Sequence, residues 1–589
     1  MRNLFLFSIA IFLWFWIAES LPGTETSGKD GAKELVGLWE AKRRFGPDIR
    51  GRMILRKVNG ALEVEVAGVS SRVKTVGNAI SFELSGDRGR FEGKYDVGRT
   101  TISGHWIQPK LVESGLPYAS PVKLKRIGPA HWQGEVEPFD DVITFFLVVK
   151  TLADDAVGAF LCNPERNLGR FIRVERIEKE GDRISLVSGG TGGERRIWAE
   201  GEYRGDVLII NFPNRGGSYD FKRVGATALS NFYPRGRPNA TYVYVPPPKM
   251  DDGWETGSLE DVGISRVAIT KFIQILIDTP ISSVSSQQDH GVLIARHGKL
   301  VLEEYFHGEH REKAHDTRSA SKSVAADLIG AAMYAGVPIH TSVPVYKVMN
   351  GGEFSPDLDP GRRAMTLEHL LTMTSGLDCD DNDPSSLGYE DRMWEQSEDF
   401  YKWTMNLKMV RQPGEKGVYC SASPNLAGGV LYRISKKSGP VLFQNLLAEP
   451  LQIKRYYLPI SPHGQYTMTG GARFLPRDFM KLAQVHLNGG SWKGRRVFTA
   501  DWSRRATTAQ SALSPYKLNY GYLWWVIEYP FKGRTIRAYF ASGNGGQVAM
   551  AVPDLDLVLG FYGGNYSDVG GRTAREVYVP KYIIPAVEK

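Results

Sequence analysis

Ser319 and Lys322 form the pair of residues whose types and spacing most directly suggest chemistry in this chain. Small and apolar residues follow from 323 to 333, and this run predicts a buried helix that ends before Gly336 and Pro338. Because residues three apart share one face of a helix, the Lys322 amine can lie beside the Ser319 hydroxyl. A lysine in apolar surroundings loses its proton more readily, and a neutral amine can act as a base. The pattern indicates a nucleophilic serine hydrolase that needs no histidine, although an N-capping serine beside a surface lysine gives the same spacing.

A second candidate group follows at residues 412–421, where Pro413 and Gly414 predict a turn. After this turn, Tyr419 and Ser421 project to the same side, since alternate residues of an extended chain share a side. A tyrosine hydroxyl near a lysine can relay protons at neutral pH if the ammonium lowers the pKa of the phenol. The alternative is a packed tyrosine whose hydroxyl has some local partner.

A third candidate group lies in the glycine-rich run 539–547, between strands that we predict at 535–540 and 548–552. Glycines after a strand let a ligand approach the backbone closely. Backbone N–H groups of this run, at Ser542, Gly543 and Asn544, are therefore candidates for binding an oxyanion or the substrate. A glycine-rich hairpin turn is the structural alternative.

Metal and cofactor chemistry have no support in the sequence. The eleven histidines show no His-Glu-x-x-His pattern, and the three cysteines lack the spacing of a zinc site. No Gly-x-Ser-x-Gly segment surrounds a candidate serine, which argues against an α/β-hydrolase. The net charge of +8 is spread over a long chain without a Lys/Arg-dense run. We therefore expect no metal, no other cofactor and no nucleic-acid partner.

The elements that position these residues fall into distinct regions. With 589 residues, of which 42% are hydrophobic and 23% charged, the chain is long enough for two or three domains with their own cores. Residues 21–235 predict an all-β region, because short alternating stretches such as 61–66 and 171–177 are separated by Gly, Asn and Asp turns. We expect this region to be a structural spacer, with substrate binding as the alternative.

Similar segments in the β region indicate an internal duplication. We expect two meanders of roughly a hundred residues each, which build two small barrels or a single sandwich. The matching segments occur in the same order in both copies: 51–54 and 169–172, 92–95 and 200–203, 124–127 and 221–224.

Residues 236–254 are predicted to be a stiff Pro-rich linker, and the pattern changes beyond it. From 255 to 589 helical patterns alternate with strands, and a hairpin predicted at 291–305 leads toward Ser319. This α/β unit is large enough to be a self-contained enzyme domain.

The three candidate groups, in this order, resemble the class C type of the serine β-lactamase and penicillin-binding-protein superfamily. Within it they resemble the esterase branch that includes 6-aminohexanoate-dimer hydrolase. The resemblance covers essentially residues 250–589 and does not extend to the β repeats. It implies an antiparallel sheet flanked by helices, together with an all-helical subdomain. Further segments carry the resemblance: 252–254, 366–379, 470–473, 477–478 and 520–525.

The resemblance also implies roles for individual residues. Ser319 would be the nucleophile, Lys322 the general base and Tyr419 the proton relay. The backbone N–H groups of Ser319 and Asn544 would form the oxyanion hole. Ser421 stands where many relatives have asparagine, and it is a candidate for binding the substrate.

Ala541 departs from the pattern of the family, in which a Lys or His cation at this place helps to hold a substrate carboxylate. The departure disfavours a β-lactamase or a D,D-peptidase. We therefore predict a serine hydrolase that cleaves an ester or amide bond of a small molecule or short oligomer. The alternatives are a D,D-peptidase or β-lactamase acting on peptidoglycan or β-lactams, and a non-catalytic binding or sensor protein with a β-repeat ligand module. The oligomeric state stays open.

The N-terminus predicts export. A short basic start precedes an apolar run from Leu4 to Ala18, which is shorter than the ~20 residues that a spanning helix needs. We interpret residues 1–20 as a cleaved secretory signal and expect a secreted or periplasmic protein without a stable membrane span. An uncleaved anchor is the alternative.

The cysteines fit an exported protein, in which a pair of thiols tends to oxidise. Cys379 and Cys420 both flank segments of the candidate site, so we predict a disulfide between them and a free thiol at Cys162. Three unpaired thiols are the alternative, since sequence alone does not fix connectivity.

Overall fold

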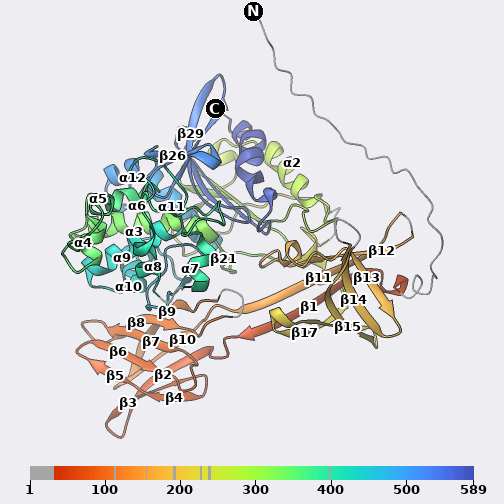
Figure 1. The fold of residues 1–589 in the computed structure, drawn as a ribbon, viewed down its shortest axis with the longest axis horizontal. Coiled ribbons are helices and arrows are strands. Elements are labelled where there is room, and N and C mark those ends of the chain that lie inside the picture. Colours follow the sequence, from red (N-terminus) through yellow and green to blue (C-terminus); the bar gives the residue numbers. More distant parts are fainter. Residues whose placement is uncertain are drawn as a thin grey trace, which may run out of the picture.

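The computed structural model describes residues 32–111, 115–153, 155–189, 194–225, 229–236, 240–396 and 399–588 (Figure 1). The predicted secretory signal, residues 1–20, lies outside the described residues. Within these ranges, no helix is both long and apolar enough to cross a membrane.

The N-terminal region is all-β, as predicted, but its two units are nested rather than consecutive. The chain starts a closed barrel with β1, leaves it to build a separate sheet from β2 to β10, and returns to the barrel at β11. Figure 1 shows β1 and β11 as long strands that run between the two units, which we call the barrel and the inserted sheet. The barrel consists of β1 (Gly37–Gly46), β11 (Asp141–Thr151), β12 (Val157–Cys162), β13 (Arg176–Glu180), β14 (Arg183–Gly189), β15 (Arg195–Arg204), β16 (Val207–Phe212) and β17 (Gly217–Arg223). The inserted sheet has the order β4 (Val69–Arg72), β3 (Ala61–Val66), β2 (Gly51–Val58), β10 (His131–Val136), β9 (Tyr118–Gly128), β8 (Thr101–Ile107), β7 (Arg90–Tyr95), β6 (Ala79–Glu83) and β5 (Lys74–Val76).

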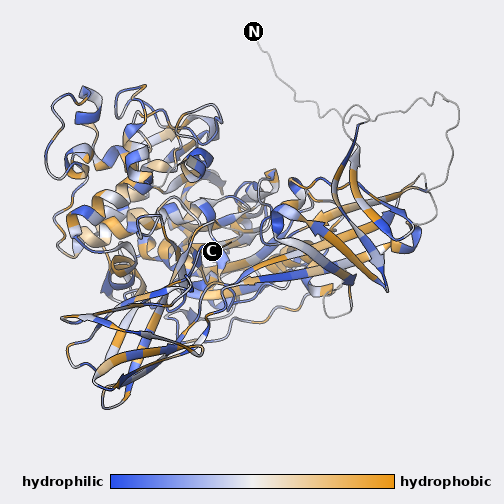
Figure 2. Ribbon diagram, turned by 60° about the horizontal axis from the view of Figure 1, so that its bottom comes forward, coloured by the Kyte–Doolittle hydropathy of each residue, from blue (hydrophilic) through white to orange (hydrophobic). Residues whose placement is uncertain are grey.

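Each β unit has a hydrophobic core of its own. Successive side chains of a strand point to opposite faces, and Figure 2 shows the resulting alternation of hydrophobic and hydrophilic residues along the strands. The barrel buries Trp39, Phe145 and Phe221, and the inserted sheet buries Phe91 and Trp106. Because these clusters are separate, the two units bury their apolar faces independently of each other.

Of the matched segments that indicated a duplication, some lie in strands in both copies, but one pair differs in structure. Residues 92–95 and 200–203 both lie in strands, β7 and β15, but 51–54 begin β2 whereas 169–172 form a 3-10 turn and the bend after it. Asn167 ahead of this turn has a left-handed backbone with a φ of 53°, and Asn163 Oδ1 accepts the backbone N–H of Arg166 at 2.8 Å. These local side-chain and backbone contacts favour a turn over a strand. The strand predicted at 171–177 therefore begins only at Arg176.

The C-terminal region combines a mainly antiparallel sheet with helices on both faces, as the resemblance implies. A side chain at Gly560 would touch Met480 of α11 (Pro476–Leu487), whereas the next residue, Phe561, packs against Tyr578 of the C-terminal helical segment Ala574–Ile583. The sheet has the order β18 (Glu255–Thr256), β20 (Lys299–Tyr305), β19 (Asp289–Arg296), β31 (Leu557–Gly563), β30 (Gln547–Val552), β29 (Arg534–Gly543), β28 (Trp525–Phe531), β27 (Leu518–Tyr520) and β26 (Ser511–Leu513). The hairpin predicted at 291–305 is thus β19 and β20.

The helices include a cluster, from α4 to α10, that packs beside the sheet (Figure 1). The helix predicted after Ser319 is α3 (Lys322–Tyr334), which contacts α9 and is buried along most of its length. The helices are α1 (Leu229–Phe232), α2 (Arg266–Ile277), α3, α4 (Val345–Met349), α5 (Pro360–Ala364), α6 (Leu367–Leu371), α7 (Glu390–Gln396), α8 (Phe400–Asn406), α9 (Ala422–Ser435), α10 (Gly439–Phe443), α11 (Pro476–Leu487) and α12 (Ala500–Ala506).

Short strands join the β region to the C-terminal region. Leu458 of β22 pairs with Ala119 of β9, so the inserted sheet continues into the C-terminal region. β22 in turn pairs with β23, and β23 pairs with β21, which lies just before Ser319. These short strands are β21 (His315–Asp316), β22 (Tyr456–Pro459) and β23 (Arg473–Phe474), with the hairpin β24 (Ser491–Trp492) and β25 (Arg495–Arg496) farther along the chain.

The packing of α3 gives a first testable prediction. A methyl group at Gly330 would lie 2.2 Å from Trp502 Nε1, and Trp502 is buried. Alanine favours an exposed helix by about 1 kcal/mol over glycine, but overpacking a core costs about 1–3 kcal/mol. We expect Gly330→Ala to lower the thermal unfolding midpoint. Gly98→Ala, where the nearest atom lies at 3.5 Å, should leave it nearly unchanged. A higher midpoint for Gly330→Ala would contradict this account of α3.

Candidate active site

Ser319 lies in a tight turn that leads directly into α3. The 3-10 turn Arg318–Ser321 precedes Lys322, the first residue of the helix. Arg318 has a left-handed backbone with a φ of 48°, and its N–H donates to Asp316 Oδ1 at 2.9 Å. Lys322 Nζ donates to Ser319 Oγ at 2.8 Å, and Lys322 is only 1% exposed. The structure thus brings together the amine and the hydroxyl that the spacing places on one face.

Tyr419 reaches the same hydroxyl from another segment. Its ring centroid lies 5.1 Å from Lys322 Nζ, and its hydroxyl shares a hydrogen bond with Ser319. Burial raises the pKa of Tyr419 well above its usual value, the hydrogen bond with Ser319 opposes the rise, and the charges of Asp381 and Glu390 add to it. The relay considered in the sequence analysis required the lysine to lower the pKa of Tyr419. This condition is not met. Tyr419 is a neutral phenol at neutral pH.

The end of β29 packs against the 3-10 turn that holds Ser319. Ser542 and Gly543 are the last residues of β29, and Asn544 follows them. A side chain at Gly543 would lie 2.2 Å from the carbonyl oxygen of Thr317, so glycine is required for the strand to pack this closely. Asn544 Oδ1 accepts the backbone N–H of Ser567 at 2.8 Å, which turns the amide of Asn544 toward that loop. The glycine-rich run is thus a wall of the site.

Ser319 lies where pockets of different character meet. A pocket of about 410 Å³ has aromatic walls that include Tyr419, Trp525 and Phe540. Another pocket, of about 690 Å³, is lined by the C-terminal region and also by the N-terminal β region. Ser319 and Asn544 line both. A molecule bound at Ser319 can therefore extend into either pocket.

The family of the C-terminal region follows from its sequence. Residues 284–565 match the Beta-lactamase family model. They form a Beta-lactamase domain. The match includes Ser319, Tyr419 and β29, so the three candidate groups all lie inside this domain.

Solved structures that are similar to part of this chain include proteins with different assignments. A protein from Bacillus anthracis assigned as a 6-aminohexanoate-dimer hydrolase is 18% identical, with a TM-score of 0.42 over 51% of this chain and 79% of its own. A protein from Bacteroides dorei DSM 17855 assigned as a β-lactamase is 18% identical, with a TM-score of 0.43 over 53% of this chain and 97% of its own. A family VIII carboxylesterase is 15% identical, with a TM-score of 0.39 over 51% of this chain and 92% of its own. The assignment of the Beta-lactamase domain rests on the family model.

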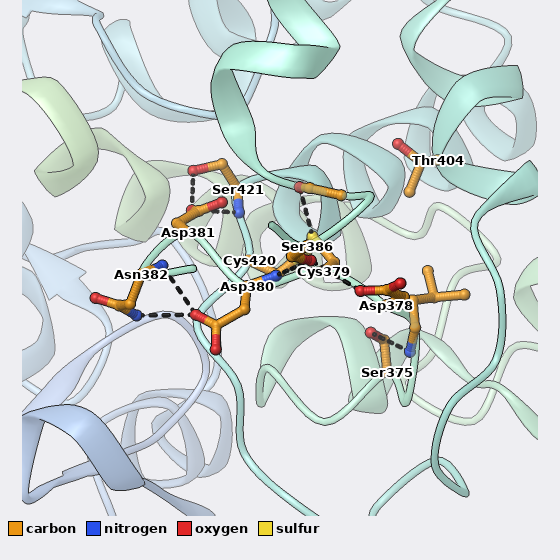
Figure 3. Close-up of a disulfide and its surroundings, with 12 residues drawn as sticks. Ser375, Asp378, Cys379, Asp380, Asp381, Asn382, Ser386, Thr404, Cys420 and Ser421 are labelled. Atoms are coloured by element: carbon orange, nitrogen blue, oxygen red, sulfur yellow. Dashed lines mark hydrogen bonds between the residues drawn. A yellow bond between two sulfur atoms is a disulfide. The ribbon is translucent and has the colours of Figure 1, made fainter. Parts of the chain in front are cut away.

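Sequence reasoning missed the carboxylate of Asp381, which lies beside Ser421 and close to a disulfide (Figure 3). Cys379 and Cys420 are bonded, and two residues beyond Cys379 the backbone N–H of Asp381 donates to the carbonyl of Tyr419 at 3.0 Å. Asp381 Oδ2 accepts from the backbone N–H of Ser421 at 2.8 Å and from its hydroxyl at 2.6 Å. Ser421, expected to bind substrate, is thus engaged by Asp381. The position of Asp381 next to the predicted disulfide was the only sequence signal for it.

Asp381 also interacts electrostatically with Lys322. Burial raises its pKa to about 7, the charge of Glu390 adds to the rise, and the charge of Lys322 and the hydrogen bonds from Ser421 oppose it. The carboxyl group therefore changes charge near neutral pH, within reach of the Lys322 amine. This behaviour is typical of functional sites, where burial and neighbouring charges shift pKa values.

Arg575 provides a cation near the third group, where Ala541 lacks one. Its Nη1 lies 3.4 Å from Ser542 Oγ, and the side chain, together with Arg572, lines the aromatic pocket. Arg575 belongs to the C-terminal helical segment, which packs on the sheet and lies after the matched family region. Since the cation comes from a distant element rather than from the motif, spacing within the motif could not reveal it.

Cys162, the third cysteine, is a buried free thiol at the end of β12. In the ranges that the structure describes, no group of three or more His, Cys, Asp or Glu side chains could hold a metal ion. Cys162 is not among the residues that line the two pockets at Ser319.

The disulfide leads to a second prediction. Cys379 and Cys420 are 41 residues apart, and a cross-link over such a loop stabilises a fold by about 4 kcal/mol in the chain-entropy model. We expect the double variant Cys379→Ser/Cys420→Ser to unfold at a clearly lower denaturant concentration than the wild type. Cys162→Ala, which removes a thiol and no cross-link, should have a much smaller effect. Equal midpoints for the double variant and the wild type would argue against the disulfide.

Proposed function

We propose that this protein is an exported serine hydrolase that cleaves an ester or amide bond through an acyl-enzyme on Ser319. The contact of 2.8 Å between the buried Lys322 Nζ and Ser319 Oγ is the observation that supports the proposal best, because an amine beside a hydroxyl can act as its base. The Beta-lactamase domain supports it, since the family consists of hydrolases. The disulfide supports export, because such bonds persist in oxidising compartments.

In the acylation step, Ser319 Oγ attacks the carbonyl carbon and the neutral Lys322 amine accepts the hydroxyl proton. The negative charge that forms on the carbonyl oxygen is received by the backbone N–H groups of Ser319 and Asn544. As the bond to the leaving group breaks, Tyr419 donates its phenol proton to that group and takes the proton held by Lys322. Water then attacks the acyl-enzyme by the same sequence in reverse and releases the acid. A neutral phenol suits this role, because it has a proton to give.

A carboxylate-bearing substrate, such as a β-lactam or a D,D-peptide, is the second candidate, and Arg575 is the observation that favours it. A guanidinium beside Ser542 can bind a carboxylate with two parallel hydrogen bonds, and it could replace the Lys or His cation that Ala541 lacks. A covalent penicillin adduct on Ser319, detected by mass spectrometry, separates this candidate from a simple esterase or amidase.

The third prediction tests the nucleophile. We expect the protein to hydrolyse a short p-nitrophenyl ester and to be labelled by a fluorophosphonate. Ser319→Ala should abolish labelling and lower turnover on the order of 10³-fold or more, because the covalent step is lost. Ser514→Ala, which removes an exposed hydroxyl, serves as the control. If Ser319→Ala kept wild-type labelling or turnover, the mechanism would be wrong.

The fourth prediction concerns Asp381, whose carboxyl group is neutral below and charged above its pKa of about 7. The charged form stabilises the Lys322 ammonium and so opposes the formation of the base. Asparagine keeps an oxygen acceptor for Ser421 but cannot become charged. We expect Asp381→Asn to extend the acidic limb of the kcat/KM profile to lower pH, by roughly one pH unit.

The control for this experiment is Asp383→Asn, because Asp383 is exposed and bonds only locally to Ser385. It should leave the pH profile unchanged. An acidic limb that moves to higher pH in Asp381→Asn, or that does not move, would contradict the proposed interaction between Asp381 and Lys322.

A further inference from the structure

The N-terminal β region is attached directly to the loops that surround Ser319. Arg166 of the barrel forms an ion pair with Asp316, three residues before Ser319. Asn167 Nδ2 donates to the carbonyl of Tyr566 at 3.0 Å. These contacts place the barrel at the mouth of the site rather than at a distance from it.

The inserted sheet is attached at a different side of the same mouth. The hydroxyl of Tyr118 donates to the carbonyl of Gly471 at 3.1 Å, and a side chain at the preceding Gly470 would lie 3.0 Å from the carbonyl oxygen of Arg318. Tyr118 starts β9, the strand that pairs with β22. Both β units are thus fixed in place, so any surface that they present to the site is formed before a substrate binds.

The pocket of about 690 Å³ is built between these units and the Beta-lactamase domain. Phe171 and Arg215 of the barrel line one part of it, and Trp394 and Glu395 of α7 line another. A volume in this range is that of a complete small-molecule site. A short acyl group bound at Ser319 would leave most of it unfilled.

The groups that line this pocket indicate what it binds. Phe171 is 55% exposed, so a large apolar ring faces the pocket mouth without being covered by the protein. The charged side chains that the β region brings are arginines, Arg166 and Arg215, whereas α7 brings carboxylates, including Glu390 and Glu395. A pocket with positive groups on one element, negative groups on another and aromatic surface suits a ligand chain that carries positive and negative charges. A chain with charges of both signs can make favourable contacts with these groups, whereas an uncharged fatty chain cannot.

The other pocket at Ser319 has a contrasting character. Tyr419, Trp525 and Phe540 give it aromatic walls, and its volume of about 410 Å³ suits a compact group. The two halves of a substrate on either side of the scissile bond are therefore recognised by different chemistry.

We propose that the N-terminal β region forms a substrate subsite of this hydrolase, in which Phe171 and Arg215 face α7 and hold a dipolar, peptide-like chain attached to the scissile carbonyl. The proposal rests on the proposed function, since the scissile bond lies at Ser319. It assigns to the β region a role in selecting the substrate, in place of the spacer that the sequence suggested.

The test compares p-nitrophenyl esters that differ only in the acyl chain. One carries acetyl, one decanoyl, one a tripeptide with a glutamate and a lysine, and one the same tripeptide with glutamine in both places. We expect the highest kcat/KM for the charged tripeptide. Phe171→Ala and Arg215→Glu should each lower that value by about tenfold or more and change acetyl ester turnover by less than twofold.

Matched controls on the β region are Ile197→Ala in β15 and Lys57→Glu in β2, which alter an exposed apolar residue and an exposed cation. Neither lines the pocket, so neither should change the selectivity. If Phe171→Ala and Arg215→Glu lower all esters equally, or if the decanoyl or glutamine ester is preferred, the proposed subsite is wrong.

Binding to Ser319→Ala separates this proposal from the proposed function. The charged tripeptide amide, titrated by calorimetry into Ser319→Ala, should bind about tenfold more weakly when Phe171→Ala or Arg215→Glu is added. Equal affinities would overturn the subsite even if the esters are cleaved. If no ester is cleaved, the hydrolase assignment fails, and the titration still decides whether the β region binds such chains.

Discussion

Asp316 is a buried carboxylate on which the β region and the Beta-lactamase domain converge. Arg166 of the barrel, Arg318 and Arg473 all form ion pairs with it. Burial alone would raise the pKa of Asp316, but the charges of these arginines outweigh it and hold the pKa well below its usual range. Removing one member of a buried ion pair leaves an uncompensated charge, which costs about 3–5 kcal/mol. Because Asp316 also accepts the backbone N–H of Arg318, the same carboxylate holds the left-handed residue next to Ser319. Asp316 therefore links the backbone beside Ser319 to the β region.

Local sequence was enough to predict the parts of the site that depend on short-range geometry. Ser319 and Lys322 are close because helical spacing brings residues three apart together, and β19 and β20 follow their alternating pattern. The parts that were missed depend on contacts between distant segments. Asp381 acquires its environment from the Tyr419 segment, and Arg575 comes from a helix after the matched family region. Apart from the position of Asp381 next to a predicted disulfide, neither contact leaves a pattern in the residues around it.

The nesting of the β units was missed for a related reason. Similar segments indicated a duplication, but repeated patterns carry no information on which strand pairs with which. β1 pairs with β11 and β17, far along the chain, so the barrel closes around the point where the inserted sheet leaves it. The direction of the Tyr419 pKa was missed because it depends on burial among the aromatic rings of Tyr516, Tyr520 and Trp525, which the chain brings together only in the folded domain.

The two walls of the larger pocket are held by different means. The wall from the β region is held by the ion pair of Asp316 and by the pairing of β9 with β22. The opposite wall, α7, follows the segment that the disulfide ties to the Tyr419 loop. A side chain at Gly388, just before α7, would lie 2.6 Å from Cys379 Cβ, so the approach to the helix is packed on the disulfide itself. The bond between Cys379 and Cys420 therefore supports both the segment that holds Asp381 and the approach to α7, so one covalent link connects the surroundings of Lys322 with a wall of the proposed subsite.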